Sequence, residues 1–322
     1  MYDLAMPATA TTAPWASPHL LGLAGVPAPA IRGLLERARQ MAPRVRAHRK
    51  GEELAGRVIA NLFLEDSTRT RLSFTRAAQL LGADVSDLTT SGSSVSKGET
   101  LADTALTIAA MGVDAIGVRA TAPGAASIVA GAVKGSVINA GDGRHEHPTQ
   151  GLLDAYTLAE GTDRLDGFDL TGLRVLIVGD VVNSRVARSA IAAMTALGAT
   201  VVCVGPPSLL PASMACLGCL VERDFDKALD GADAVMMLRV QFERHLSRGA
   251  IASPREYRRF YALTAERATR LPPRALIMHP GPMNRGVEID GSVYDLPRTV
   301  ILKQVTNGVA VRMAALEACM GF

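Results

Sequence analysis

The sequence predicts an α/β protein with two domains, each a parallel β-sheet flanked by helices. One observation is size: 322 residues with 48% hydrophobic content fit roughly two domains better than one. A second is that apolar runs of strand type alternate with helical patterns along the chain. A third is that these runs are continuously apolar, which predicts strands buried on both faces, as in a parallel sheet.

The individual elements follow from hydrophobic periodicity. Short β-type runs mark the strands, and several of the helical segments between them end in Gly, as helices often do. The predicted strands are 57–65, 114–119, 136–140, 174–180, 200–205, 234–239 and 275–280, and the predicted helices are 70–83, 100–112, 149–161 and 184–199.

Composition along the chain suggests the domain limits. A polar, turn-rich stretch at 160–172 has a strand-and-helix series on both sides, which places the boundary near the helix just before it. The start of the chain is rich in Ala, Thr and Pro, as mobile termini often are. We therefore expect a mobile tail over 1–17, a first domain over 18–150, a second domain over 151–305, and a C-terminal helix over 306–322 that returns to the first domain.

Charge and cysteine content exclude several classes of function. A formal charge of +3 is too weak and too dispersed to predict nucleic acid or an anionic membrane as the partner, so a small ligand is favoured. Prolines interrupt the uncharged N-terminal stretch, and it lacks the basic start of a signal peptide. Four cysteines are too few for a disulfide framework, which indicates the cytoplasm. Cys216 and Cys219 form a C-x-x-C pair, but no second pair completes a zinc site, so we interpret both as helix or loop thiols.

The segment "FLEDSTRTRLSF" (63–74) is the first candidate site. A strand should end near Glu65 and a helix should start near Thr68, so hydroxyls and Arg69 gather at a helix N-terminus, where free N–H groups bind anions. A phosphate or a carboxylate would fit. The alternative is that Ser67 only caps the helix while the arginines are solvated. Two arginines flanked by hydroxyls favour the anion site, and no nucleotide P-loop motif occurs in the chain.

Two further loops carry polar side chains. The Ser/Gly-rich loop "SGSSVSKGETLADT" (91–104) can present Lys97 to a ligand, although a surface linker is the alternative. The segment "NAGDGRHEHPTQ" (139–150) follows a buried strand at its carboxyl end, where open α/β sheets bind ligands. His147 and Gln150 lie one turn apart there and could polarise a carbonyl and hold its substituents. The alternative for His147 is a helix-start residue satisfied by local backbone, and His145 with His147 lacks the companions of a metal site.

The second half of the chain adds cationic and rigid segments. Residues 175–205 have the plan of a dinucleotide fold, but the G-x-G-x-x-G turn and the acidic residue for the ribose are missing, which argues against NAD. The turn instead offers Arg185 at a helix start. Arg239 and Gln241 lie on one side of an extended segment and, together with Arg185, could bind two carboxylates. Pro280 and Pro282 flank Gly281 in a rigid turn that exposes carbonyls, with a plain loop as the alternative.

Six phrases in order carry a family resemblance: "STRTR", "SSVSKGETLADT", "NAGDGRHEHPTQ", "SRVARS", "RVQFERH" and "HPGPMNRGVEI". Together they span nearly the whole chain and closely resemble the catalytic chains of aspartate carbamoyltransferases, within the aspartate/ornithine carbamoyltransferase superfamily. The ornithine enzymes typically have a lysine before S-T-R-T-R and H-C-L-P near the end. This chain has Glu65 and Asp66 in the first place and His279-Pro280-Gly281-Pro282 in the second.

The resemblance implies a reaction, a pathway and a set of roles. The reaction is transfer of the carbamoyl group of carbamoyl phosphate to the α-amine of L-aspartate, the committed step of de novo pyrimidine biosynthesis, without a cofactor or a metal. It also implies a homotrimer with shared active sites, in which Ser93 and Lys97 reach a neighbouring chain. The implied carbamoyl phosphate ligands are Ser67, Thr68, Arg69, Thr70, Arg119, His147, Gln150, Pro280, Gly281 and the neighbour's Ser93 and Lys97; the implied aspartate ligands are Lys97, Arg185, Arg239 and Gln241; and the implied catalytic residues are Arg69, Thr70, Lys97, Arg119 and His147.

Some points stay open at the level of sequence. Asn183 stands where many relatives have His, and Val182 where some have Lys, which bears on aspartate affinity. The competing hypotheses are transfer to another amino acid such as ornithine, an NAD-dependent dehydrogenase, and a carbamoyltransferase-like subunit without activity. Partners beyond the trimer, such as a regulatory chain or dihydroorotase, are not specified by the sequence.

Overall fold

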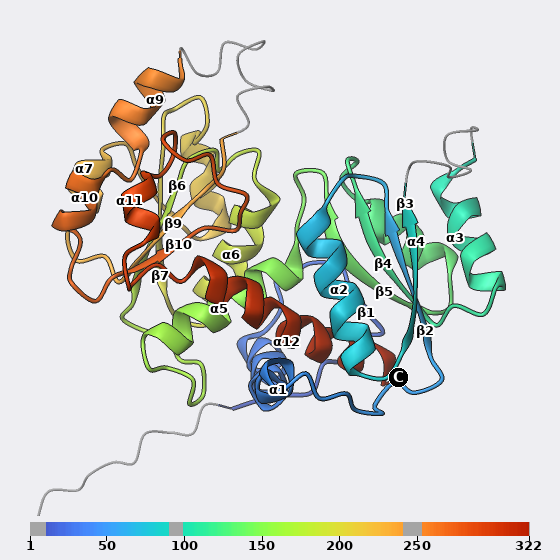
Figure 1. The fold of residues 1–322 in the computed structure, drawn as a ribbon. Coiled ribbons are helices and arrows are strands. Elements are labelled where there is room, and N and C mark those ends of the chain that lie inside the picture. Colours follow the sequence, from blue (N-terminus) through green and yellow to red (C-terminus); the bar gives the residue numbers. More distant parts are fainter. Residues whose placement is uncertain (1–10, 90–98, 241–252, 322) are drawn as a thin grey trace, which may run out of the picture.

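The computed structural model of the protein describes residues 11–89, 99–240 and 253–321. It confirms the predicted fold class, because two five-stranded sheets with parallel strand pairs are each flanked by helices (Figure 1). Each of the seven predicted strands and four predicted helices is present, with ends that differ by a few residues.

The first sheet has the strand order β1-β5-β4-β2-β3. One face is covered by α3 and α4, and α1, α2 and α12 contribute to the core on the other face (Figure 1). Its strands are β1 His19–Leu20, β2 Val58–Phe63, β3 Asp84–Thr89, β4 Ala115–Ala120 and β5 Ser136–Asp142.

The second sheet has the order β10-β9-β6-β7-β8. Residues of α7, α10 and α11 pack with one face, while α6 packs between the other face and α5. Its strands are β6 Arg174–Val178, β7 Thr200–Val204, β8 Leu220–Glu222, β9 Ala234–Met237 and β10 Leu276–Met278.

The helices differ in how much of their surface is buried. Most expose one side, whereas α5 is buried on all sides from Pro148 to Ala159, which is the pattern of a helix inside a core. The helices are α1 Ala28–Arg46, α2 Thr68–Leu80, α3 Leu101–Ala110, α4 Ala125–Ala132, α5 Pro148–Gly161, α6 Arg185–Ala196, α7 Phe225–Ala228, α9 Pro254–Tyr261, α10 Ala265–Arg270, α11 Gly291–Tyr294 and α12 Ile301–Met320, with the short 3₁₀ helix η2 Ala212–Leu217.

The last helix, α12, runs from the second sheet back to the first domain, as predicted (Figure 1). It contacts β10 near its start and α1, α2, α5 and β5 along its length. One continuous core therefore includes apolar residues from both sheets. The predicted start of this helix at residue 306 is wrong, because the helix begins at Ile301. Its first turn contains Lys303 and Gln304, so it does not share the apolar pattern of the rest of the helix.

The sequence reading missed some elements and contacts. Helix α1 was not predicted, although Ile31, Leu34, Leu35 and Ala38 follow helical spacing and are buried. The predicted tail includes Trp15, which packs against the core and donates a hydrogen bond to the carbonyl of His19 over 3.2 Å.

Both sheets contain a point where the strand order reverses. In the first sheet, β2 lies between β3 and β4, so the segments after β2 and β4 diverge to opposite sides of a crevice. In the second sheet, β6 lies between β7 and β9 in the same way. Ligands of open α/β sheets bind at the carboxyl ends of strands at such points.

Within the described ranges, no helix combines the length and the apolar character needed to cross a membrane.

Candidate active site

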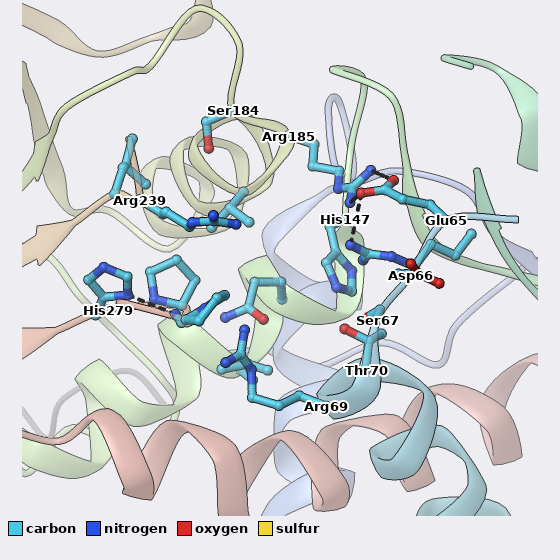
Figure 2. Close-up of a pocket in the computed structure, with 18 of the residues that line it drawn as sticks. Glu65, Asp66, Ser67, Arg69, Thr70, His147, Ser184, Arg185, Arg239 and His279 are labelled. Carbon is cyan, nitrogen blue, oxygen red and sulfur yellow. Dashed lines mark hydrogen bonds and ion pairs between the residues drawn. The ribbon is translucent and has the colours of Figure 1, made fainter. Parts of the chain in front are cut away.

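A cavity of about 710 Å³ lies between the two domains, at the carboxyl ends of both sheets. Its walls come from the segment after β2, the end of β4, the start of α5, the start of α6, the segments after β9 and β10, and α12 (Figure 2). Among its lining residues, cationic side chains outnumber carboxylates: Arg69, Arg119, Arg144, Arg185, Arg239 and Arg312 against Glu65, Asp66 and Asp180. The cavity therefore favours ligands with several negative charges.

The N-terminus of α2 forms one wall. Ser67 is the N-cap residue with extended backbone, yet its side chain makes no capping hydrogen bond, so the simple capping alternative does not describe it. Thr68, Arg69 and Thr70 form the first turn, whose N–H groups lack partners within the helix. The pKa of Arg69 is lowered, first by the loss of solvation at the cavity wall and then by the nearby charge of Arg239. This wall has the donors and the charge of a phosphate site.

The turn after β10 lies against the same arginine. A Cβ atom built on Gly281, whose φ is +68°, would lie 3.0 Å from Cζ of Arg69. The turn is held from within by the buried His279, whose Nδ1 accepts a hydrogen bond from the N–H of Gly281 over 2.8 Å. The other ring nitrogen of His279 lies 3.2 Å from Oε1 of the buried Glu288. Only glycine combines this φ with the close approach of Arg69.

Glu65 connects two arginines from different domains, and Figure 2 shows its pair with Arg185. Its Oε1 and Oε2 atoms lie 2.9 and 2.8 Å from the two terminal nitrogens of Arg185, and Oε1 lies 3.3 Å from Nη2 of Arg119. Arg119 also donates to the carbonyl of Ala140 over 3.1 Å. Burial, followed by the charge of Arg185, lowers the pKa of Arg119 to about 10. Arg119 thus stays charged at neutral pH and has a fixed orientation.

His147 is the N-cap residue of α5 and is 3% exposed. Its pKa lies well below 6.5, first because burial disfavours the charged form and then because Arg312, Arg119 and Arg185 repel a further positive charge. The backbone N–H of His147 donates to Oγ of Ser189 over 2.9 Å, and Ser189 donates to Glu146 over 2.7 Å. A neutral imidazole therefore lines the cavity at neutral pH.

The sequence reading missed Arg312, which lines the cavity from α12 and is 4% exposed. Its guanidinium lies 5.3 Å from the centre of the Phe74 ring and donates to the carbonyl of Gly308 over 3.0 Å. Burial lowers the pKa of Arg312 to about 10. A cation inside the mainly apolar pattern "NGVAVRMAALEACM" was the available signal.

The structure brings most of the predicted site residues to this one cavity. Asn183 also lines it, and its Nδ2 donates to Asp180 over 2.8 Å. Arg188, one turn after Arg185, is half-buried and donates through Nη2 to the carbonyl of Val182 at 3.4 Å. Ser93, Lys97 and Gln241 lie outside the described residues. The predicted residues found together are Ser67, Thr68, Arg69, Thr70, Arg119, His147, Gln150, Arg185, Arg239, Pro280 and Gly281.

The cysteines lie away from this cavity. All four are free; Cys216 is exposed in η2, while Cys219 is buried and donates to the carbonyl of Met214 over 3.3 Å. In the part of the chain that the structure describes, no group of three His, Cys, Asp or Glu side chains is arranged to hold a metal ion.

Two family models match the chain in succession. Residues 18–160 match the aspartate/ornithine carbamoyltransferase carbamoyl-P binding domain, and residues 171–319 match the Asp/Orn binding domain. The chain is 51% identical over 304 residues to the aspartate carbamoyltransferase catalytic subunit of Thermobifida fusca, covering 94% of this chain and 95% of that one.

Solved structures of similar fold include members of both branches. One is the aspartate transcarbamoylase of Trypanosoma cruzi in complex with carbamoyl phosphate and aspartate, with a TM-score of 0.83, 27% identity and coverage of 97% of this chain and 98% of that chain. Another is the ornithine carbamoyltransferase of Pyrococcus furiosus, with a TM-score of 0.83, 29% identity and coverage of 96% and 99%. The chain belongs to the aspartate/ornithine carbamoyltransferase family.

Proposed function

We propose that the protein is an aspartate carbamoyltransferase, a one-carbon transferase that moves the carbamoyl group of carbamoyl phosphate to the α-amine of L-aspartate, releasing phosphate. The observation that carries this proposal is that one cavity contains an anion site at the start of α2 and, across it, Arg185 and Arg239 from the second domain. Relatives at about half identity are named aspartate carbamoyltransferase catalytic subunit, which supports the same substrate pair. The product is N-carbamoyl-L-aspartate, a precursor of pyrimidines.

The phosphate end of the first substrate binds to the start of α2. Ser67, Thr68 and Thr70 supply hydroxyl and backbone donors, and Arg69 supplies charge where the helix dipole is positive. Ser93 and Lys97 of a neighbouring chain complete this site in the proposed assembly. These donors stabilise the phosphate as it leaves with its electron pair.

The carbamoyl group lies between the two domains. As the amine of aspartate attacks the carbamoyl carbon, the carbonyl oxygen gains negative charge, and Arg119, His147 and Thr70 stabilise it. The neutral imidazole acts as a hydrogen-bond donor here, since its pKa is lowered well below 6.5. Gln150 and the backbone of Pro280 and Gly281 bind the amide end. No covalent intermediate and no cofactor take part in this scheme.

Aspartate is held by its two carboxylates. Arg185, Arg239 and Gln241 are the proposed ligands, with Lys97 from the neighbouring chain. Two arginines on the side of the second domain suit a dicarboxylic acid better than ornithine, which has a single carboxylate. Carbamoyl phosphate is thus assigned to the first domain, residues 18–150 completed by α12, and aspartate to the second domain, which begins at residue 151.

The proposed active unit is a cytoplasmic homotrimer with shared sites. It rests on the roles of Ser93 and Lys97 that the family resemblance implies, and the name catalytic subunit in the relatives agrees with an assembly of several chains.

The direct test is an assay of the purified protein with carbamoyl phosphate and either L-aspartate or L-ornithine. We expect carbamoylaspartate and phosphate in equal amounts and no citrulline. Arg69→Ala should abolish both products, while Arg57→Gln, an exposed arginine paired with Asp114 outside the cavity, should not change the rate. Formation of citrulline without carbamoylaspartate would assign the protein to the ornithine branch instead.

A further inference from the structure

The buried carboxylate of Asp154 connects two parts of the cavity wall that are distant in sequence. Asp154 lies on α5, one turn after Gln150, and is 0% exposed. Its Oδ1 accepts hydrogen bonds from Nε2 of Gln150 over 2.9 Å and from Nε2 of Gln304, on α12, over 2.8 Å. Gln304 in turn accepts, through Oε1, the backbone N–H of His279 over 3.0 Å.

The chemistry of the amide group determines what these contacts do. A side-chain amide has one donor end and one acceptor end, and a carboxylate oxygen can only accept from it. Asp154 therefore fixes the donor ends of Gln150 and Gln304 toward itself. The oxygen of Gln150 is then the end that can accept a hydrogen bond in the cavity. The oxygen of Gln304 holds the N–H of His279, at the start of the turn that contains Pro280.

We propose that Asp154 is a positioning residue for carbamoyl phosphate. It orients the oxygen of Gln150 toward the NH₂ group of carbamoyl phosphate. Through Gln304 it also holds the carbonyl of Pro280 toward that NH₂ group. Two acceptors from different parts of the chain are thereby set for one NH₂ group that carries two donors. This inference rests on the proposed function, since it concerns the carbamoyl end of that substrate.

The arrangement does not depend on whether Asp154 carries a proton. Burial raises the pKa of Asp154 to about 7, and the charged group that faces it is Arg312 of α12. Both amides donate to Oδ1, whereas Oδ2 has no hydrogen-bond partner among the described residues. A proton on Oδ2 leaves Oδ1 an acceptor, so both amides keep their orientation on either side of neutral pH.

A purely structural role is the alternative, because α5 and α12 share other buried polar contacts. Nδ2 of Asn307 donates to Oγ1 of Thr157 over 3.1 Å and to Glu160 over 2.7 Å. These contacts lie further along the two helices and include no residue that lines the cavity. Thr157 therefore provides a matched control for a hydrogen bond lost from the same helix interface.

The test compares the binding of carbamoyl phosphate with that of inorganic phosphate in the full-length protein by titration calorimetry. Only carbamoyl phosphate has the amide group, whereas both ligands use the start of α2. In Asp154→Leu, we expect the preference for carbamoyl phosphate over phosphate to fall roughly tenfold, about the effect of one lost hydrogen bond. Asp154→Asn keeps an acceptor oxygen and should retain the preference, and Thr157→Val should retain it as well.

Other outcomes separate this inference from the proposed function. An Asp154→Leu protein that loses affinity for both ligands by the same factor, or for neither, would overturn the positioning role. If Asp154→Leu does not fold, Gln304→Met removes the link to His279 while Asp154 remains, and it must show the same selective loss. A wild-type protein that does not carbamoylate aspartate would instead refute the proposed function, whatever the variants show.

Discussion

The carboxylate of Glu65 and the guanidinium of Arg185 form a two-point ion pair across the cavity, with contacts of 2.8 and 2.9 Å. Glu65 follows β2 of the first sheet, and Arg185 opens α6 beside the second sheet. Because Glu65 also lies 3.3 Å from Arg119, one carboxylate holds one cation from each domain.

Replacing this carboxylate should therefore affect the second substrate. In Glu65→Gln the charge is lost, so Arg185 is no longer held toward the cavity. We expect kcat/KM for aspartate to fall by about tenfold or more, since the pair is mostly buried and charge-assisted. Steady-state kinetics with saturating carbamoyl phosphate measure this effect. Arg57→Gln breaks an exposed ion pair elsewhere and is the control; equal effects of the two substitutions would contradict the role of Glu65.

The contact of Gly281 with Arg69 gives a second prediction. In Gly281→Ala the new methyl group would displace the guanidinium, so affinity for phosphate should fall roughly tenfold, the scale of one weakened charge-assisted contact. Gly286 is a matched control, because its φ is +78° but nothing lies within 4 Å of an added Cβ. Gly286→Ala should lower stability by about 1 kcal/mol through backbone strain and leave phosphate binding unchanged. Calorimetric titration distinguishes the two, and identical phosphate affinities would argue against the contact.

The lowered pKa of His147 predicts how stability depends on pH. Above pH 6.5 the imidazole is neutral in both the folded and unfolded states. As the pH falls below 6.5, the unfolded state binds a proton that the folded state refuses, so His147 reduces the free energy of unfolding there. The free energy of unfolding of the wild type minus that of His147→Asn, measured by urea unfolding, should thus decrease as the pH falls from about 7 to about 5. A difference that does not change over this range would mean that the histidine titrates normally.

The same histidine should matter for the reaction rate. His147→Asn should lower kcat roughly 10²-fold, as the loss of one oxyanion donor does in other enzymes. Stopped assays of carbamoylaspartate at several pH values test this, and a variant with full activity would remove His147 from the scheme.

Asp154 predicts the opposite dependence on pH. Its pKa is raised from 3.8 to about 7, mainly by burial. Between these values the unfolded state releases a proton that the folded state keeps, so the contribution of Asp154 to the free energy of unfolding falls as the pH rises from about 4 to about 7 and is constant above. The unfolding free energy of the wild type minus that of Asp154→Asn should decline between pH 5 and 7 and then level off. A flat difference would contradict the raised pKa.

The proposed trimer can be tested by complementation. Arg69→Ala and Lys97→Ala should each be inactive alone, because each removes one cation of the anion site. If sites are shared, a mixed trimer contains a site in which both cations are intact, so activity should return on mixing the two variants after dissociation. Activity of the mixture and its mass in solution are the measurements. Mixed trimers that form but stay inactive would refute the sharing.

The sequence predicted the strand-and-helix series well, because continuous apolar runs specify buried strands whatever their neighbours are. It did not predict β3, where Asp84 and Asp87 interrupt the apolar pattern, or the strand order, which depends on contacts between distant segments. Cavity residues in phrases such as "STRTR" were identified from the sequence, but the contacts that they make with one another were not. That Glu65 pairs with Arg185, 120 positions away, could not be read from spacing.

Arg312 and Asp154 illustrate a different limit. Each is an ionisable residue within a mainly apolar helical pattern, a signal that the sequence does contain. Its meaning depends on what α5 and α12 face, and that is set by the packing of the whole chain.

The return of α12 to the first domain has a consequence for synthesis on the ribosome. The hydroxyl of Ser136, at the start of β5, donates to the carbonyl of Cys319 over 2.8 Å, and α1 and α2 pack on the same helix. The domain encoded first thus lacks one of its walls until α12 has been translated. The second domain, by contrast, has its sheet complete once β10 has emerged. The nascent first domain must therefore wait, with an apolar face uncovered, for α12 to dock.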